Sequence, residues 1–487
     1  MRQSRNQYVS KAIVILTVIL LSFNSIQTAA ATNTLNPNEL TNADQSLTIS
    51  ADTTLTINSN EKTTIQGSII ITGTVDTKPK LEIINNGELT IKTTIQCTIA
   101  NLTIQNKGTL TIQDQNINLS GNATLNIINT GTLTIDNAGI NVYGGVVYIN
   151  NDGTLNANNW NLKDQYDGTS FTNNKDAVLT NTSFTANGAF GLHNIANNGN
   201  LQLTNCVFDA NYGGTINFNS QYGTLTIDGS GFSASGASHG KTSSISILTG
   251  QATWKSSIIE SNSASIIYSD YGAENTMQGC TFKGIGNYNT NGVETMTDCT
   301  ITNLNNYNNV GTASFINCKL LDINNYNNGG NIKFTNCNVT NIHNLANNGN
   351  LEITNTQFTS NANMNILNSK SISADNWMLK TNRDTTKITL TNQANLTFTT
   401  SFIENVDVQT LTSLGATPTV FNQASGGTIT VTNVGLIQTV AKEAPSQQSL
   451  LIGVIIATIV IIIVAVIVLK KRRTRTLNNR TTITPEG

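Results

Sequence analysis

The chain has 487 residues, of which only 11% are charged, and its formal net charge is −2. Between the basic segments at its two ends lie 17 basic and 27 acidic residues, so the central part carries a net charge of −10. This balance disfavours nucleic acid as a partner, because polyanions need a basic surface. Low charge with many Asn, Thr and Gly residues can also indicate disorder, but the regular spacing of Leu, Ile and Phe described below argues against it.

The N-terminal segment, residues 1–31, is typical of a secretory signal peptide. Three basic residues come first, residues 12–21 form an apolar core, and small residues follow up to Ala31. Cleavage after Ala31 would fit the small-residue pattern of such signals. An uncleaved anchor helix is the alternative, and the short core disfavours it, because a bilayer needs about 20 apolar residues.

The central segment repeats with a period of 19 residues, which three residue types show together. The cysteines of the repeat are Cys280, Cys299, Cys318 and Cys337, the asparagines are Asn287, Asn306, Asn325 and Asn344, and the tyrosines are Tyr288, Tyr307 and Tyr326. Recurrence at a fixed period is typical of a solenoid, in which each repeat is one structural unit.

Within each repeat the apolar residues follow one rule, which predicts short β-strands. An apolar residue is followed by another two positions later, by a small or apolar residue five positions later and by an apolar residue seven positions later. Ile332, Phe334, Cys337 and Val339 form one such set. A spacing of two places both side chains on one face of a strand. The residue before the third position is usually Asn, Asp or Gly, and it would turn the chain so that the next strand faces inward too.

Fifteen such sets predict an all-β parallel β-helix over residues 45–438. Their first positions are residues 110, 133, 155, 177, 201, 225, 252, 275, 294, 313, 332, 351, 372, 396 and 429. A coil of about 20 residues cannot bury its inner face alone, whereas stacked coils bury a continuous core. We expect right-handed coiling from the general handedness of parallel connections.

The rule has exceptions. Asn275 and Glu294 stand at first positions, and at the coil of Leu89 the last two positions hold Thr94 and Gln96. We therefore expect the pattern to weaken towards the N-terminus.

The C-terminal part predicts a membrane anchor. Residues 441–449 are expected to be a linker, and the uncharged apolar residues 450–469 span about 30 Å as a helix, which matches the hydrocarbon core of a bilayer. The tail, residues 470–487, begins with basic residues, which stay in the cytoplasm. We expect a single-pass protein of the cell membrane, with its ectodomain outside and its tail in the cytoplasm.

Residues 197–205 and 347–355 share the sequence NNGNLx(L/I)TN. With the coil length, the recurring Asn positions and the predicted anchor, this rung resembles the right-handed parallel β-helices of the pectate-lyase-like superfamily, and within it the adhesin-like, membrane-anchored surface proteins of prokaryotes. The resemblance covers most of the chain. It implies a fold, and through that fold either adhesion or polysaccharide cleavage.

The four repeated cysteines have two interpretations. Metal sites usually pair cysteines two to four residues apart, unlike these. On neighbouring coils their Cα atoms would lie about 4.8 Å apart, so bridges such as Cys280–Cys299 or Cys318–Cys337 are permitted outside the cell. The interpretation favoured here is a ladder of thiols that fills one inward position.

The repeated Asn and Tyr residues suggest a ligand site. We expect the Asn287 series to face inward and to form a hydrogen-bonded amide ladder. By alternation Tyr288, Tyr307 and Tyr326 would face outward, where a column of rings can stack on sugars or contact a partner. A ring stack that only shields a turn is the alternative.

Other candidate sites are weaker. Six N-x-S/T sequons are candidates for N-glycosylation, although chance matches are expected in so Asn-rich a chain: Asn101, Asn118, Asn122, Asn181, Asn338 and Asn395. No catalytic, cofactor-binding or metal-binding set stands out, because the acidic residues are scattered. His239 falls in a longer loop, and His193 and His343 fall in equivalent repeats that architecture explains.

These observations favour a cell-surface adhesion, recognition or envelope-structural protein that presents a β-helix outside the membrane. Its partner would be an extracellular glycan or a surface protein, with no cofactor, and binding would use the side of the solenoid and the longer loops at 233–251 and 404–428. The alternative is a membrane-tethered polysaccharide lyase or hydrolase. Carboxylates gathered on one outer face would favour that alternative.

Overall fold

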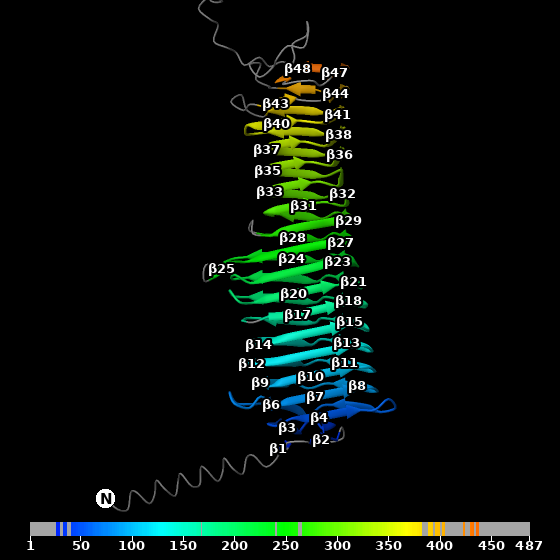
Figure 1. Cartoon of the computed structure of the whole chain (residues 1–487), viewed down its shortest axis with the longest axis vertical. Helices are drawn as coiled ribbons and strands as arrows, with labels where there is room; N and C mark the ends of the chain where they lie inside the picture. The colour runs from blue at the N-terminus through cyan, green and yellow to red at the C-terminus, as the bar shows by residue number, and fades with distance from the viewer. Residues whose placement is uncertain are drawn as a thin grey trace, which may run out of the picture. The chain divides into compact units, whose positions relative to one another are not determined.

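The computed structural model is an all-β parallel solenoid of about 15 turns, as the sequence predicts (Figure 1). It describes residues 26–29, 33–36, 40–166, 168–238, 241–261, 265–381, 388–392, 395–399, 402–404, 422–423, 429–432 and 435–437. Within these ranges no helix is long and apolar enough to cross a membrane. The predicted linker, anchor and tail lie outside the described residues, as does most of the predicted signal peptide, of which β1 (Ile26–Ala29) pairs with β3 (Ser46–Ile49).

Each coil has three sides, which one 19-residue coil illustrates. Side one is β34 (Thr312–Ile316), and β35 (Lys319–Asn328) bends to supply side two and then side three. The next coil repeats this order with β36 (Asn331–Thr335) and β37 (Asn338–Asn347). The strand pairs between coils are parallel and match equivalent residues, for example Phe315 with Phe334, and the register shifts only at bends such as that between Ser120 and Ala123. The backbone groups of each coil are therefore satisfied by its two neighbours.

The extra residue between side one and side two has a left-handed backbone, which explains why it is usually Asn, Asp or Gly. Asn336, between Phe334 and Cys337, has φ +55°. The equivalent residue of every other coil with a first position from 110 to 372 also has positive φ: Asp114, Asn137, Asn159, Asn181, Asn205, Gly229, Ser256, Gly279, Asp298, Asn317, Asn355 and Asn376. Asn, Asp and Gly tolerate this conformation best, so the residue type marks the bend.

The predicted core positions face inward. Ile332, Phe334, Cys337 and Val339 are all buried. Phe315 and Phe334 stack with ring centroids 5.0 Å apart, as expected for equivalent residues on neighbouring coils. The core is therefore a set of columns, each built from one position of the coil.

Two details of the prediction are wrong. At the coil of Leu89 the turn lacks the extra residue, so Thr93 and Ile95 face inward in place of Thr94 and Gln96. The regular coils consequently continue towards the N-terminus, where β5 (Lys62–Ile65) pairs with β8 (Glu88–Ile91).

The second error concerns side three, where the buried amide ladder is not the Asn287 series. It is formed by the Asn that ends side three, directly before the turn to the next coil, as in the NNG turns that begin at Asn85, Asn197 and Asn347. One run is Asn85, Asn106, Asn129, Asn151, Asn173 and Asn197, and the other is Asn309, Asn328, Asn347 and Asn368. Asn328 Nδ2 donates to Asn347 Oδ1 at 2.7 Å and to the Asn350 carbonyl at 2.9 Å. Each amide thus satisfies a neighbour and a turn, which makes its burial tolerable.

Glycines stack at the corner beside this ladder, where the backbones of neighbouring coils approach closely. A Cβ on Gly330 would lie 2.0 Å from the Gly311 carbonyl oxygen, and one on Gly349 would lie 1.9 Å from that of Gly330. At these two glycines the coils approach so closely that a Cβ would collide with the backbone of the preceding coil.

Replacing Gly330 with Ala should therefore destabilise the solenoid by about 1–3 kcal/mol, the usual cost of overpacking. The matched control is Gly329→Ala, because a Cβ at Gly329 meets its nearest atom, the Asn309 carbonyl oxygen, at 3.4 Å. Urea unfolding of both variants measures the difference. Equal stability of the two would contradict the stacked-glycine corner.

Candidate functional site

The predicted tyrosine column is inside the solenoid, so the expected outward orientation is wrong. Tyr288, Tyr307 and Tyr326 are each 0% exposed. Their rings stack, with centroids 5.4 Å apart between Tyr288 and Tyr307 and 4.8 Å between Tyr307 and Tyr326. A slip of one residue reverses every side chain of a strand, and here it moves the rings from the surface to the core. They cannot contact an external ligand.

The Asn287 series lies on the outer surface instead and still forms a ladder. Asn306 Nδ2 donates to Asn287 Oδ1 at 2.9 Å, and Asn325 Nδ2 donates to Asn306 Oδ1 at 2.8 Å. Asn344 and Asn365 extend the ladder at 3.1 Å per step. These amides form an ordered, uncharged strip on side three.

The four repeated cysteines form a buried column of free thiols. Cys318 Sγ donates to the carbonyls of Ile316 and Met296, each at 3.3 Å. The hydrogen-bonded contact with Cys299 and burial raise the pKa of Cys280. Trp160, Thr356 and Trp377 are buried at the equivalent position of other coils, which supports space filling as the role of this position.

The remaining cysteines, Cys97 and Cys206, are also buried free thiols. Burial raises the pKa of Cys97 to about 12 and that of Cys206 to about 11. Thiols protonated at neutral pH are poor nucleophiles.

All six cysteines should therefore resist alkylation in the native protein and react after unfolding. Iodoacetamide labelling under native conditions and then in denaturant without reductant, followed by mass spectrometry, should count zero and then six modified thiols. A count of two or four after unfolding would show disulfides between coils.

Glu294, an exception to the core rule, lies in a buried polar cluster that the sequence analysis missed. Tyr288 Oη donates to Glu294 Oε1, and Thr290 Oγ1 donates to Oε2 at 2.6 Å. Tyr307 Oη lies 3.4 Å from Oε2. Burial raises the pKa of Glu294 to about 7.

The cluster occupies a gap in the inward Asn ladder. Between Asn197 and Asn309 the ladder position holds only hydroxyl residues: Ser220, Thr249, Ser269 and Thr290. Asn275, the other exception, donates to Ser269 Oγ at 2.7 Å and to Thr249 Oγ1 at 3.1 Å. Asn275 and Glu294 thus provide hydrogen-bond partners for the Ser and Thr hydroxyls that occupy the ladder position in place of Asn.

His193 is the second buried titratable group. It is 0% exposed, its ring lies edge-on to Phe184, and neither ring nitrogen has a hydrogen-bond partner among the described residues. Burial lowers the pKa of His193 to about 4. His343, which has the same local sequence, is only half-buried, because its neighbour Ile342 is the residue that faces inward there. His239 lies outside the described residues.

These two groups give opposite pH dependences. The Glu294 pKa is raised from 4.5 to about 7, so its contribution to stability is fully present below about pH 4.5 and is lost as the pH rises through 7. The His193 pKa is lowered from 6.5 to about 4, so its contribution is present above about pH 6.5 and is lost as the pH falls through 4.

On acidification from pH 7 to 4.5, Glu294→Gln should lose about 3 kcal/mol of unfolding free energy relative to the wild type, because the variant lacks the contribution that Glu294 makes at low pH. His193→Leu should change the slope in the opposite sense by a similar amount. Urea unfolding at several pH values measures both slopes. Parallel profiles for the wild type and both variants would refute the assignment.

All six sequons lie in the described residues, and the five asparagines whose exposure is described are at least partly exposed. Asn122, Asn181 and Asn338 are exposed, and Asn101 and Asn118 are half-buried. Asn395 belongs to β44 (Asn395–Thr399), and nothing of its side chain is described.

Carboxylates do not gather on the described outer surface. Asp209 and Glu260 share one row of side two but are separated by Ser233 on the coil between them. Glu260 is paired with Lys283, and Glu352 with Lys333 at 2.6 Å. Within the described ranges no group of three His, Cys, Asp or Glu side chains could hold a metal ion.

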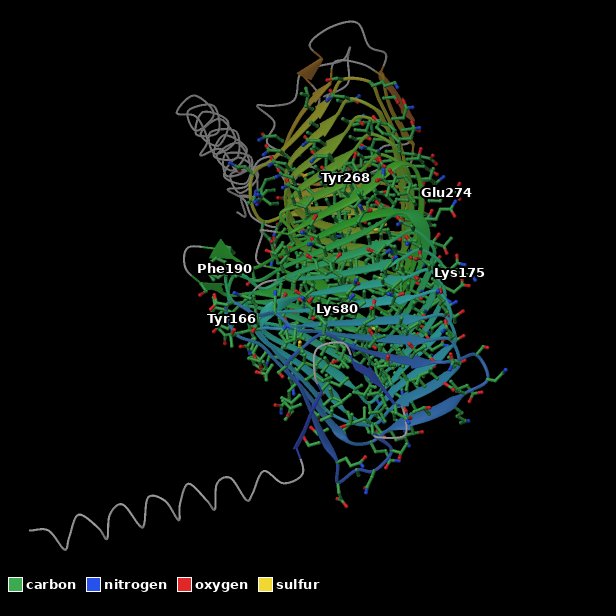
Figure 2. The ribbon with its side chains drawn as sticks, turned by 60° about the horizontal axis from the view of Figure 1, so that its bottom comes forward. Lys80, Tyr166, Lys175, Phe190, Tyr268 and Glu274 are labelled. Carbon is green, nitrogen blue, oxygen red and sulfur yellow. The ribbon has the colours of Figure 1, made fainter. Side chains whose placement is uncertain are left out.

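A column of exposed aromatic residues at the corner between sides two and three is the surface feature that sequence reasoning missed. Tyr143, Tyr166, Phe190 and Tyr212 come from four consecutive coils and are 50%, 57%, 59% and 65% exposed. We call them the aromatic corner. Figure 2 shows Tyr166 and Phe190 at the same edge of the ribbon, opposite Lys175 and Glu274.

Buried polar groups fix the backbone of this corner. Asp164 accepts hydrogen bonds from the backbone N–H groups of Tyr166, at 3.3 Å, and Leu192, at 3.4 Å. Ser243 accepts one from the Gly213 N–H at 2.8 Å and donates to the Ser235 carbonyl at 2.6 Å. Ser243 thereby holds the loop that carries the hairpin of β25 (Ala237–Ser238) and β26 (Lys241–Thr242) beside Tyr212.

Comparison with family models, with curated proteins and with solved structures found no match to this chain. The assignment of a parallel solenoid therefore rests on the strand pairing alone, and the likeness to the pectate-lyase-like superfamily remains a prediction from the repeat.

Proposed function

We propose that this chain is a cell-surface recognition or adhesion protein that presents its solenoid outside the membrane and binds an extracellular glycan at the aromatic corner. The exposed aromatic column carries the proposal. Rings on a rigid backbone offer large contact area at a small cost in conformational entropy, and the apolar C–H faces of sugar rings stack on such surfaces. The predicted signal peptide and anchor would place the corner outside the cell.

The surroundings of the corner favour a neutral ligand. The central part of the chain carries a net charge of −10, which would repel an acidic polysaccharide. The outer face of side two beside the corner offers amide and hydroxyl groups, such as Asn141, Thr185 and Ser233, which can donate to and accept from sugar hydroxyls. The loop at 233–251, expected to take part in binding, borders this corner through the β25–β26 hairpin.

A glycan array probed with the full-length chain in mild detergent tests the proposal, and the expected result is binding to neutral glycans. The double variant Tyr166→Ala, Tyr212→Ala should weaken binding at least tenfold, as loss of two stacking rings would. Tyr222→Ala is the control, because Tyr222 is 78% exposed at a different corner. Equal binding by all three proteins, or no binding to any glycan, would refute the glycan role.

Display at the surface is tested separately by protease treatment of intact cells. The solenoid should be cleaved or shed, and an epitope after residue 487 should stay protected. Protection of the whole chain would refute the proposed topology.

A further inference from the structure

Side three carries no charged residue at its two outward positions over twelve consecutive coils, from β12 (Asn116–Asn129) to β40 (Met364–Asn368). The first row is Asn126, Tyr148, Ser170, Asn194, Asn217, Ser246, Ile266, Asn287, Asn306, Asn325, Asn344 and Asn365. The second row is Ile128, Asn150, Thr172, Ala196, Asn219, Leu248, Tyr268, Asn289, Asn308, Asn327, Ala346 and Leu367. We call these rows the neutral face.

The neutral face contrasts with the rest of the described surface. Side one carries the ion pair Lys333–Glu352, and side two carries Lys283–Glu260. Side three itself carries the pair Lys80–Glu82 on a coil N-terminal to the neutral face. Charge is therefore absent from one defined region of an otherwise acidic surface.

The polar groups of the neutral face are already ordered. Asn306 donates to Asn287 in the first row, and in the second row Asn308 Nδ2 donates to Asn289 Oδ1 at 2.8 Å. Asn327 Nδ2 continues the second row to Asn308 at 2.8 Å. A partner that packs on these side chains does not have to immobilise them, so association costs less entropy than on a mobile polar surface.

The size of the neutral face suits a stable interface. Twelve coils at about 4.8 Å cover roughly 50 Å, and about five residues of strand cover roughly 15 Å. The product, on the order of 800 Å², equals the area that each partner contributes to a standard interface. Tyr148, Ile266 and Leu367, which are 50%, 41% and 37% exposed, add apolar contacts within this area.

We propose that the neutral face joins two copies of this chain, sheet against sheet. Two acidic molecules repel one another over most of their surfaces, and the neutral face is the described region where they can approach without that cost. Facing sheets with ordered Asn ladders can interdigitate at about 10 Å. This pairing goes beyond the proposed glycan binding, since the aromatic corner is a different surface.

The test is sedimentation velocity of the full-length chain in non-ionic detergent over a wide concentration range. The double variant Asn217→Asp, Asn306→Asp keeps the size of both side chains and places charges in the face. It should weaken dimerisation at least tenfold. The matched control, Asn156→Asp with Gln202→Glu, adds the same charge to outward positions of side one and should dimerise like the wild type.

Added salt gives a second measurement. It should strengthen dimerisation of the wild type, because it screens the repulsion between two acidic chains, whereas an interface of ion pairs would weaken. Melting curves by circular dichroism establish that each variant is folded, and Asn306→Asp alone replaces the double variant if that one melts early.

Three results would overturn the proposal: a wild type that stays monomeric at every concentration, equal dimerisation of the wild type and the face variant, or dimerisation that weakens with salt. A monomeric wild type that binds a neutral glycan through the neutral face would assign that surface to the glycan instead. Loss of glycan binding in the aromatic-corner variant has no bearing on the dimer, so the two proposals fail independently.

Discussion

The in-register hydrogen bonding of one coil to the next is the constraint on which the rest of this structure depends. It places every residue about 4.8 Å from the equivalent residue of the neighbouring coils. An inward group must therefore be compatible with its own neighbours in a column. Phe315 on Phe334 and Tyr307 on Tyr326 meet this condition by stacking, and at Gly330 and Gly349 the spacing leaves no room for a side chain.

The same constraint makes a polar interior tolerable. A carboxamide both donates and accepts, so a column of Asn residues satisfies itself along its length, as Asn328 and Asn347 do. The shorter Ser and Thr side chains do not span the distance from one coil to the next as Asn does. Where they replace Asn in the column, Asn275 and Glu294 supply the hydrogen-bond partners. The cost is a buried carboxyl group whose raised pKa, near 7, links folding to pH.

The outer surface uses the regular spacing differently on each side. Sides one and two carry the ion pairs Lys333–Glu352 and Lys283–Glu260, whereas the outer face of side three is neutral over twelve coils. The aromatic corner lies where sides two and three meet, next to the β25–β26 hairpin. In the proposals above, the corner recognises a ligand and the neutral face holds a second copy, so one solenoid would separate two kinds of contact by the side on which they occur.

The sequence by itself determined the fold class and most of the core. The set Ile332, Phe334, Cys337 and Val339 alternates clearly, and the Asn before its third position marks the bend, so period and turn chemistry suffice there. The inward position of the cysteines followed from the same rule.

Only the tertiary structure decided the phase of side three and the place of the exposed rings. In NNYNN, Asn occurs on both sides of Tyr307, so no apolar alternation identifies the inward residue. Pairing of Asn309 with Asn328 in the buried ladder fixes it, and with it the burial of Tyr307. The exposed rings do not recur at one fixed spacing, because their coils differ in length. Only the stacking of coil on coil brings them to one corner: Tyr143, Tyr166, Phe190 and Tyr212.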